Sequence, residues 1–448
     1  VTQMAEPTSL QELPDYVNMK VTTSSEFALR GLSNKIKVLF EIKTDHPPQD
    51  QEPKKRRPLN LAIVLDRSGS MRGDKLTNAK KAICKVIQNL GTEDVLHFVV
   101  YDSKVQTIFQ NASVTKETRS SLQTQVKAIK PKGMTNLWGG VSQAAELIKE
   151  HNKEGATKRI FLFSDGIVNK GVKKSTDIHE MVSDLYHSQD VKVSAFGLGE
   201  DFDEDLMRNI AEFGTGTYFF IEGASAIVKF VDFALTGLLK AIGSDTKLKI
   251  RGKNSATLTK IYGHKDLVQG ALLDDLKQDN SREVVAVLEV KPTEHVVEEE
   301  LLTWELSYVP SALNDEKPSN ERVVGSGVVT IKYTDDEDTF NSSMNVNVEV
   351  AEALQIASEI DAEVITLLDS KKTDEAVESQ ERQITMLKAL VEKDESGRVK
   401  ALLEQTESAL ANLKKEGNSR KVRKQVQHQG YMKRRASIGY TAGYCSFD

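Results

Sequence analysis

Between residues 60 and 242, short apolar segments alternate with longer segments that show helical periodicity. A segment that is apolar at nearly every position is typical of a strand buried on both faces, and an intervening helix supplies the crossover that parallel strands need. The alternation therefore predicts a doubly wound α/β sheet with helices on both faces. The expected strands are 60–65, 95–101, 105–109, 159–164, 191–197 and 217–221, and the expected helices are 75–90, 116–129, 137–150, 177–187, 204–213 and 226–241.

One of these strands is expected to run against the others. The segment 105–109 follows the strand 95–101 after a very short turn, which leaves no room for a crossover helix. We therefore predict that it forms an antiparallel edge of the sheet.

Helical periodicity disappears between residues 247 and 350, where β-rich segments are separated by turn residues. Several strands at this spacing favour a β-sandwich. The segments 19–22 and 35–44 also look like strands but have no sheet of their own, so we expect them to join this sandwich, with the α/β domain inserted between its parts. The strands expected after the α/β domain are 247–252, 256–263, 283–291, 301–308, 323–333 and 343–350.

Beyond residue 351 the apolar residues again recur at helical spacing, in three stripes separated by short polar breaks. This pattern predicts a small antiparallel bundle of three helices. The expected organisation is a flexible N-terminus 1–16, a β-sandwich 17–45 plus 245–350, a linker 46–58, an α/β domain 59–242, a helical bundle 351–416 and a basic tail 417–448.

Composition limits the classes of function. The net charge of −6 over 448 residues argues against broad nucleic-acid binding, and no apolar stretch approaches the length of a membrane span. The chain has only two cysteines, Cys84 and Cys445, so a disulfide framework is not expected. This favours a cytoplasmic location, with an extracellular or anchored one as the alternative if a leader was removed before Val1.

The strand 60–65 is followed directly by an acid, Asp66, and then by two serines at alternate positions, Ser68 and Ser70. In an open α/β sheet, ligands bind at the carboxyl ends of the strands. A carboxylate and two hydroxyls at that edge are ligands suited to a hard divalent cation such as Mg²⁺. Turn and helix-cap chemistry is the alternative interpretation of either serine taken alone.

Two further segments place oxygen ligands at the same sheet edge. Thr135 lies in a loop that precedes the helix 137–150, and Asp165 follows the apolar strand 159–164. Together with Asp66, Ser68 and Ser70, they supply two carboxylates, which neutralise a divalent ion, and three hydroxyls. We expect Mg²⁺, with Ca²⁺ or Mn²⁺ as alternatives.

These three motifs, Asp-x-Ser-Gly-Ser-Met, Gly-x-Thr-Asn-Leu and Ser-Asp-Gly, resemble the metal-ion-dependent adhesion site of von Willebrand factor type A (VWA) domains. The resemblance covers about residues 59–242, and the wider arrangement resembles VWA proteins with a Vwaint-type C-terminal region. It implies that Ser68 and Ser70 bind the ion directly, that Asp66 and Asp165 often bind through water, and that Thr135 binds directly when a ligand is engaged. An acidic residue of a protein partner would complete the coordination.

Catalysis finds little support in the sequence. No histidine stands in a recognisable catalytic setting, and the chain has neither a Gly-x-Ser-x-Gly turn nor a Gly-x-x-x-x-Gly-Lys phosphate loop. We therefore expect a non-enzymatic protein-binding module. The alternative is a structural component that self-assembles or builds a larger complex with an inert metal site, and a hydrolase is a remote third interpretation.

The basic tail leaves two interpretations open. Arg434 and Arg435 precede Ser437 in a pattern that basophilic kinases modify, so Ser437 is a candidate phosphorylation site. The alternative is a basic segment that covers acidic surface.

Overall fold

The computed structural model describes residues 12–46, 56–165, 168–199, 203–221, 226–264, 266–273, 275–311 and 322–419, together with residues 422, 423, 426 and 430. Ser437 lies outside the described residues, as does most of the expected linker 46–58. The chain divides into two compact units. One comprises residues 53–240 and 311–319, and the other comprises 1–52, 241–310 and 320–448.

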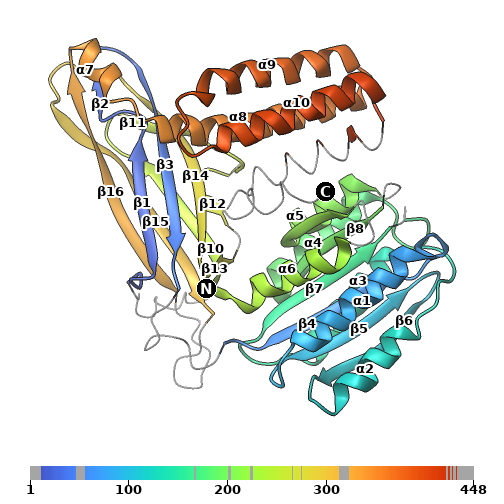
Figure 1. The fold of residues 1–448 in the computed structure, drawn as a ribbon. Coiled ribbons are helices and arrows are strands. Elements are labelled where there is room, and N and C mark those ends of the chain that lie inside the picture. Colours follow the sequence, from blue (N-terminus) through green and yellow to red (C-terminus); the bar gives the residue numbers. More distant parts are fainter. Residues whose placement is uncertain are drawn as a thin grey trace. The chain divides into compact units, whose positions relative to one another are not determined.

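The first unit is the α/β unit, whose six-stranded sheet has the order β6-β5-β4-β7-β8-β9 (Figure 1). All neighbouring strands are parallel except β5 and β6, so the expected antiparallel edge is confirmed. Every residue of the central strand β4 is buried, which means that both faces of the sheet are covered. The strands are β4 (Leu59–Asp66), β5 (Val95–Tyr101), β6 (Val105–Ser113), β7 (Thr157–Ser164), β8 (Lys192–Leu198) and β9 (Thr215–Ile221).

A helix follows each strand of this sheet except β5, as the alternation predicts. Helix α3 packs against β4 and β5, α5 packs against β8 and β9, and α1 packs beside α6 and α2. The helices are α1 (Asp74–Asn89), α2 (Thr118–Lys127), α3 (Leu137–Glu150), α4 (Ser175–Gln189), α5 (Glu204–Phe213) and α6 (Ile227–Leu239), and a short 3-10 helix, η1 (Gly69–Met71), precedes α1.

The second unit contains a β-sandwich built from both sides of the α/β segment in sequence. Its sheets have the orders β1-β3-β14-β11 and β12-β10-β15-β16-β2, with β13 paired to β10, and they share one hydrophobic core. The N-terminal strands join these sheets as expected. The strands are β1 (Val17–Thr23), β2 (Phe27–Leu29), β3 (Asn34–Thr44), β10 (Ala241–Gly252), β11 (Ala256–Ile261), β12 (Ala271–Leu272), β13 (Leu276–Lys277), β14 (Asn280–Val290), β15 (Glu298–Pro310) and β16 (Val323–Thr334).

The helical region of this unit begins earlier than the sequence indicates, and the strand expected at 343–350 is wrong. After α7 (Glu337–Ser342), helix α8 runs from Val346 to Asp369, with the Asn345 side chain accepting a hydrogen bond from the Asn347 amide at its start. Val348 and Ala351, three residues apart, pack together in one cluster with the sandwich residue Leu39. This tertiary contact selects the helix over the β preference of the alternating valines.

The remaining helices are α9 (Thr373–Val391) and α10 (Arg398–Glu416), and they pack with α8 as the predicted three-helix arrangement (Figure 1). Among the residues that the structure describes, no helix is both long and apolar enough to cross a membrane.

Candidate metal site

The candidate site is built at the carboxyl ends of two adjacent parallel strands. Strand β4 ends at Asp66, and its neighbour β7 ends at Ser164, directly before Asp165. Because parallel neighbours end on the same edge, the two carboxylates approach one another although 99 positions separate them in the numbering (165 − 66 = 99). Both side chains are buried.

Hydrogen bonds join four of the five predicted residues into one cluster. The Ser70 hydroxyl donates to Asp165 Oδ1 at 2.9 Å, and the Oγ atoms of Ser68 and Ser70 are 3.0 Å apart. Asp66 accepts from the Ser68 amide at 2.7 Å through Oδ1 and from the Ser164 hydroxyl at 3.0 Å through Oδ2. The turn after β4 therefore directs both serine hydroxyls toward the two acids.

Thr135 reaches this cluster through its loop. The Gly69 amide donates to the Gly133 carbonyl at 3.2 Å, which fixes the Thr135 loop beside the serine turn. The Asn169 side chain accepts from the Thr135 amide at 2.8 Å. The Thr135 side chain is buried, but no hydrogen bond between its hydroxyl and another described residue joins it to the other four.

An ion pair that the sequence analysis missed holds the Thr135 loop in place. Arg67 Nε lies 2.8 Å from Asp102 Oδ2, and the backbone of each residue binds the loop: Lys132 N donates to Arg67 O, and Asn136 N donates to Asp102 O. Gly133 has φ of +72°, and a Cβ there would lie 3.1 Å from Asp102 Oδ1. Asp102 directly follows strand β5, as Asp165 follows β7, so the same sequence signal could have found it.

Lys75 is the second residue that the sequence analysis missed. It lies in the first turn of α1, and its Nζ is 2.6 Å from Asp165 Oδ2. Both carboxylate oxygens of Asp165 are therefore engaged, one by a hydroxyl and one by an ammonium group.

The buried acids make the site attractive to a cation. Burial raises the pKa of Asp66 to about 6, and the nearby charge of Asp165 acts in the same direction, while hydrogen bonds from Ser68 and Ser164 partly oppose the shift. A raised carboxyl pKa means that the protein environment disfavours the ionised carboxylate, and a cation bound nearby would stabilise that ionised form.

The chemistry of the donor set fits a hard divalent ion. Four side chains of the cluster present carboxylate or hydroxyl oxygens, and Mg²⁺ is commonly bound by few carboxylates with water in the remaining positions. Within the described ranges, no group of three or more His, Cys, Asp or Glu residues is placed to hold a metal ion. An ion at Asp66 would therefore depend on the serine hydroxyls as well as on the two acids.

The side chain of His97 has both ring nitrogens engaged in hydrogen bonds within the α/β unit. It is buried in β5, where its Nε2 pairs with Asn60 Oδ1 at 3.0 Å and its Nδ1 accepts from the Asn111 amide. Because Nδ1 accepts a hydrogen bond, the ring is the neutral Nε2–H tautomer. His97 is a structural group of the sheet.

The buried imidazole predicts that one contribution to the stability of the α/β unit is lost in acid. Burial, followed by the charge of His151, lowers the pKa of His97 from 6.5 to about 4. The unfolded chain then binds more protons between these values, so the His97 contribution to stability is lost as the pH falls from 6.5 to 4, by up to about 3 kcal/mol. Urea unfolding at pH 7.5 and 4.5 should show that acid shifts the free energy of unfolding less toward instability in His97→Gln than in the unmodified chain. The exposed His295 gives the control His295→Gln, and an unchanged loss in His97→Gln would contradict the assignment.

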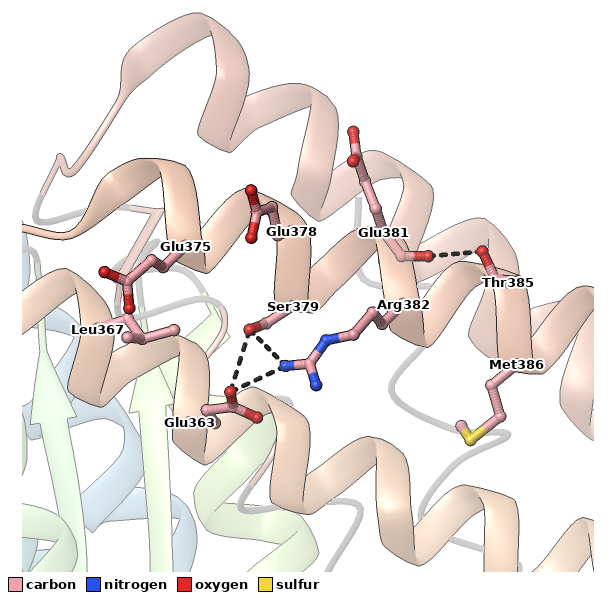
Figure 2. A pocket seen from close by; sticks show the side chains of 9 residues that line it. All are labelled: Glu363, Leu367, Glu375, Glu378, Ser379, Glu381, Arg382, Thr385 and Met386. Carbon is pink, nitrogen blue, oxygen red and sulfur yellow. Dashed lines mark hydrogen bonds and ion pairs between the residues drawn. The ribbon is translucent and has the colours of Figure 1, made fainter.

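A cavity of about 740 Å³ lies elsewhere, between α8 and α9 of the second unit (Figure 2). Glu363 of α8 accepts hydrogen bonds from Ser379 and Arg382 of α9, and these side chains point toward one another in the figure. Glu375 and Glu381 pair with Lys372 and Lys414. Much of the acidic charge of this cavity is thus balanced by neighbouring cations.

Comparison with known proteins identifies the α/β unit. Residues 60–232 match the family model of the von Willebrand factor type A domain. The inter-alpha-trypsin inhibitor heavy chain H3 of Homo sapiens is 30% identical over 160 residues, which is 34% of this chain and 18% of that protein. The protein YfbK of Escherichia coli K12 is 26% identical over 213 residues, 47% of this chain and 36% of that protein. Residues 60–232 are therefore similar to VWA domains, and the matched part of this chain spans much less than two thirds of the length of these relatives.

Solved structures share the fold of both units. A von Willebrand factor type A protein from Catenulispora acidiphila has a TM-score of 0.65 at 16% identity, covering 86% of this chain and 89% of that one. The ArnB paralog VWA2 from Sulfolobus acidocaldarius has a TM-score of 0.59 at 18% identity, covering 93% and 98%. The predicted VWA-type α/β fold is confirmed.

Proposed function

We propose that the VWA domain binds a protein partner through a divalent cation held by Asp66, Ser68, Ser70, Thr135 and Asp165. The observation that carries the proposal is the convergence of two buried carboxylates and two serine hydroxyls within one hydrogen-bonded cluster at the sheet edge. Mg²⁺ is the expected ion, with Ca²⁺ or Mn²⁺ as alternatives. The site is proposed to act as a metal-ion-dependent adhesion site.

The carboxylates and the serine hydroxyls are expected to bind the ion in different ways. Both oxygens of Asp66 and of Asp165 already accept hydrogen bonds, so these acids suit binding through water, whereas the Ser68 and Ser70 hydroxyls can turn their lone pairs to an ion. We expect Thr135 to contribute its hydroxyl when a ligand is engaged. The ion then supplies an electrophilic position for an acidic side chain of the partner.

The proposed role is non-enzymatic, and the sandwich and helices, which we assign to a Vwaint-type region, would present the VWA domain. The alternative is a structural protein that self-assembles through its sandwich and helices with an inert ion. The adhesion module and the structural protein differ in whether partner binding needs the ion.

A pull-down from native extract tests the proposal. We expect the partner to be captured in Mg²⁺ and lost in EDTA, and to be lost in the Ser68→Ala/Ser70→Ala double variant because two ligand hydroxyls are gone. The control Ser120→Ala removes an exposed hydroxyl of α2 and should retain the partner. Capture that is insensitive to EDTA and to the double variant would favour the structural alternative.

A further inference from the structure

We propose that Lys75 is a tethered cation that lowers the affinity of the site for a divalent ion alone and makes ion binding depend on an arriving carboxylate. This inference rests on the proposed function, and it adds a residue that sets the specificity of that site. Lys75 is not one of the five predicted ligands.

The geometry places a full positive charge inside the cluster. Lys75 Nζ lies 2.6 Å from Asp165 Oδ2, and the Asp165 side chain is 0% exposed, while that of Lys75 is 27% exposed. Water therefore screens this charge less than it would screen a surface ion pair.

The end of strand β8 is shaped to admit the lysine. Gly199 follows β8 with φ of +85°, and a Cβ built there would lie 2.7 Å from Lys75 Cε and 2.9 Å from Nζ. Any other residue would have to displace the end of the lysine side chain. The missing side chain of Gly199 thus leaves the space in which Lys75 reaches Asp165.

The effect of Lys75 on ion binding follows from the net charge of the cluster. Asp66 and Asp165 when ionised contribute −2, and Lys75 contributes +1, so the cluster offers a divalent ion a net charge of −1. With the ion bound, the sum is +1, and one external carboxylate restores neutrality. Without Lys75, the ion alone would balance the two acids, and a partner carboxylate would add unbalanced negative charge. Lys75 therefore weakens binding of the ion and strengthens binding of an acidic ligand to the ion.

The experiment compares Mn²⁺ binding to the full chain and to Lys75→Met by isothermal titration at pH 7.5. Methionine keeps most of the apolar length of the side chain and removes the charge. We expect at least about tenfold tighter Mn²⁺ binding, since unit charges a few ångströms apart in a partly buried site interact by more than one factor of ten in affinity. Lys75→Arg keeps the charge and should retain the weaker affinity.

A second measurement separates this role from simple stabilisation of Asp165. Replacing sodium chloride by sodium acetate at equal concentration should tighten Mn²⁺ binding more in the unmodified chain than in Lys75→Met. A lysine that only stabilised the fold would leave the acetate effect unchanged. Lys81→Met is the matched control, because Lys81 is an exposed lysine of the same helix. Its loss should change neither the Mn²⁺ affinity nor the effect of acetate on that affinity.

The outcomes are distinguishable. Tighter Mn²⁺ binding with a reduced acetate effect in Lys75→Met supports the inference. Measurable binding to the unmodified chain with equal or weaker binding to Lys75→Met overturns the inference and leaves the proposed function standing. Absence of Mn²⁺ binding to both proteins overturns the proposed function, and the inference falls with it.

Discussion

Asp66→Asn is expected to abolish divalent binding and, at the same time, to stabilise the VWA domain in EDTA. Binding is lost because the site keeps only Asp165, whose charge Lys75 already balances. Stability rises because the variant no longer buries a carboxylate whose pKa is raised from 3.8 to about 6. At neutral pH this shift of about two units corresponds to roughly 3 kcal/mol of folding free energy.

The hydrogen bonds around position 66 can also be made by an asparagine side chain. Asn Oδ1 can accept from the Ser68 amide, and its NH₂ group can donate to Ser164 Oγ, so both existing hydrogen bonds have an equivalent. The two effects are measured by Mn²⁺ titration and by urea unfolding in EDTA at pH 7.5.

Asp74→Asn, which changes an exposed acid near the site, is the control and should alter neither quantity substantially. Retained Mn²⁺ binding in Asp66→Asn would contradict the metal site. A lower free energy of unfolding in Asp66→Asn would show instead that the buried carboxylate of Asp66 does not destabilise the fold.

The second large effect is expected in the other unit, where Arg398→Met should destabilise the attachment of α10 to the sandwich by about 3 kcal/mol. Arg398 makes two hydrogen bonds to Glu283 of β14, at 2.7 and 2.5 Å, and the Glu283 side chain is only 5% exposed. Removing the arginine leaves this carboxylate buried without its cation, which is the costly way to break such a pair. Urea unfolding followed by circular dichroism measures the loss.

Two further variants test that explanation. Adding Glu283→Leu to Arg398→Met removes the stranded charge and should recover most of the stability. Lys388→Met breaks the exposed pair with Glu407 and should cost less than about 1 kcal/mol. Equal losses in Arg398→Met and Lys388→Met would contradict a role for burial.

The sequence was sufficient for the α/β fold because its signal is local and repeated. Strand β4 is apolar from Leu61 to Leu65, directly before Asp66, and the short turn before β6 permits only an antiparallel partner, so each feature depends on neighbouring residues. The same locality explains the error at 343–350. There the alternating valines satisfy a strand pattern, and only the contact of Val348 and Ala351 with the sandwich selects a helix.

For the candidate site, the sequence by itself determined which residues follow the carboxyl ends of the strands, and so gave Asp66, Ser68, Ser70, Thr135 and Asp165 as candidates. Only the tertiary structure decided what surrounds them: the ion pair of Arg67 with Asp102 behind the Thr135 loop, and the Lys75 ammonium on Asp165. The physical reason is that a strand end is fixed by local apolar pattern. The charge of a site is instead the sum over side chains from separate helices and loops, and their distances exist only once the sheet has assembled.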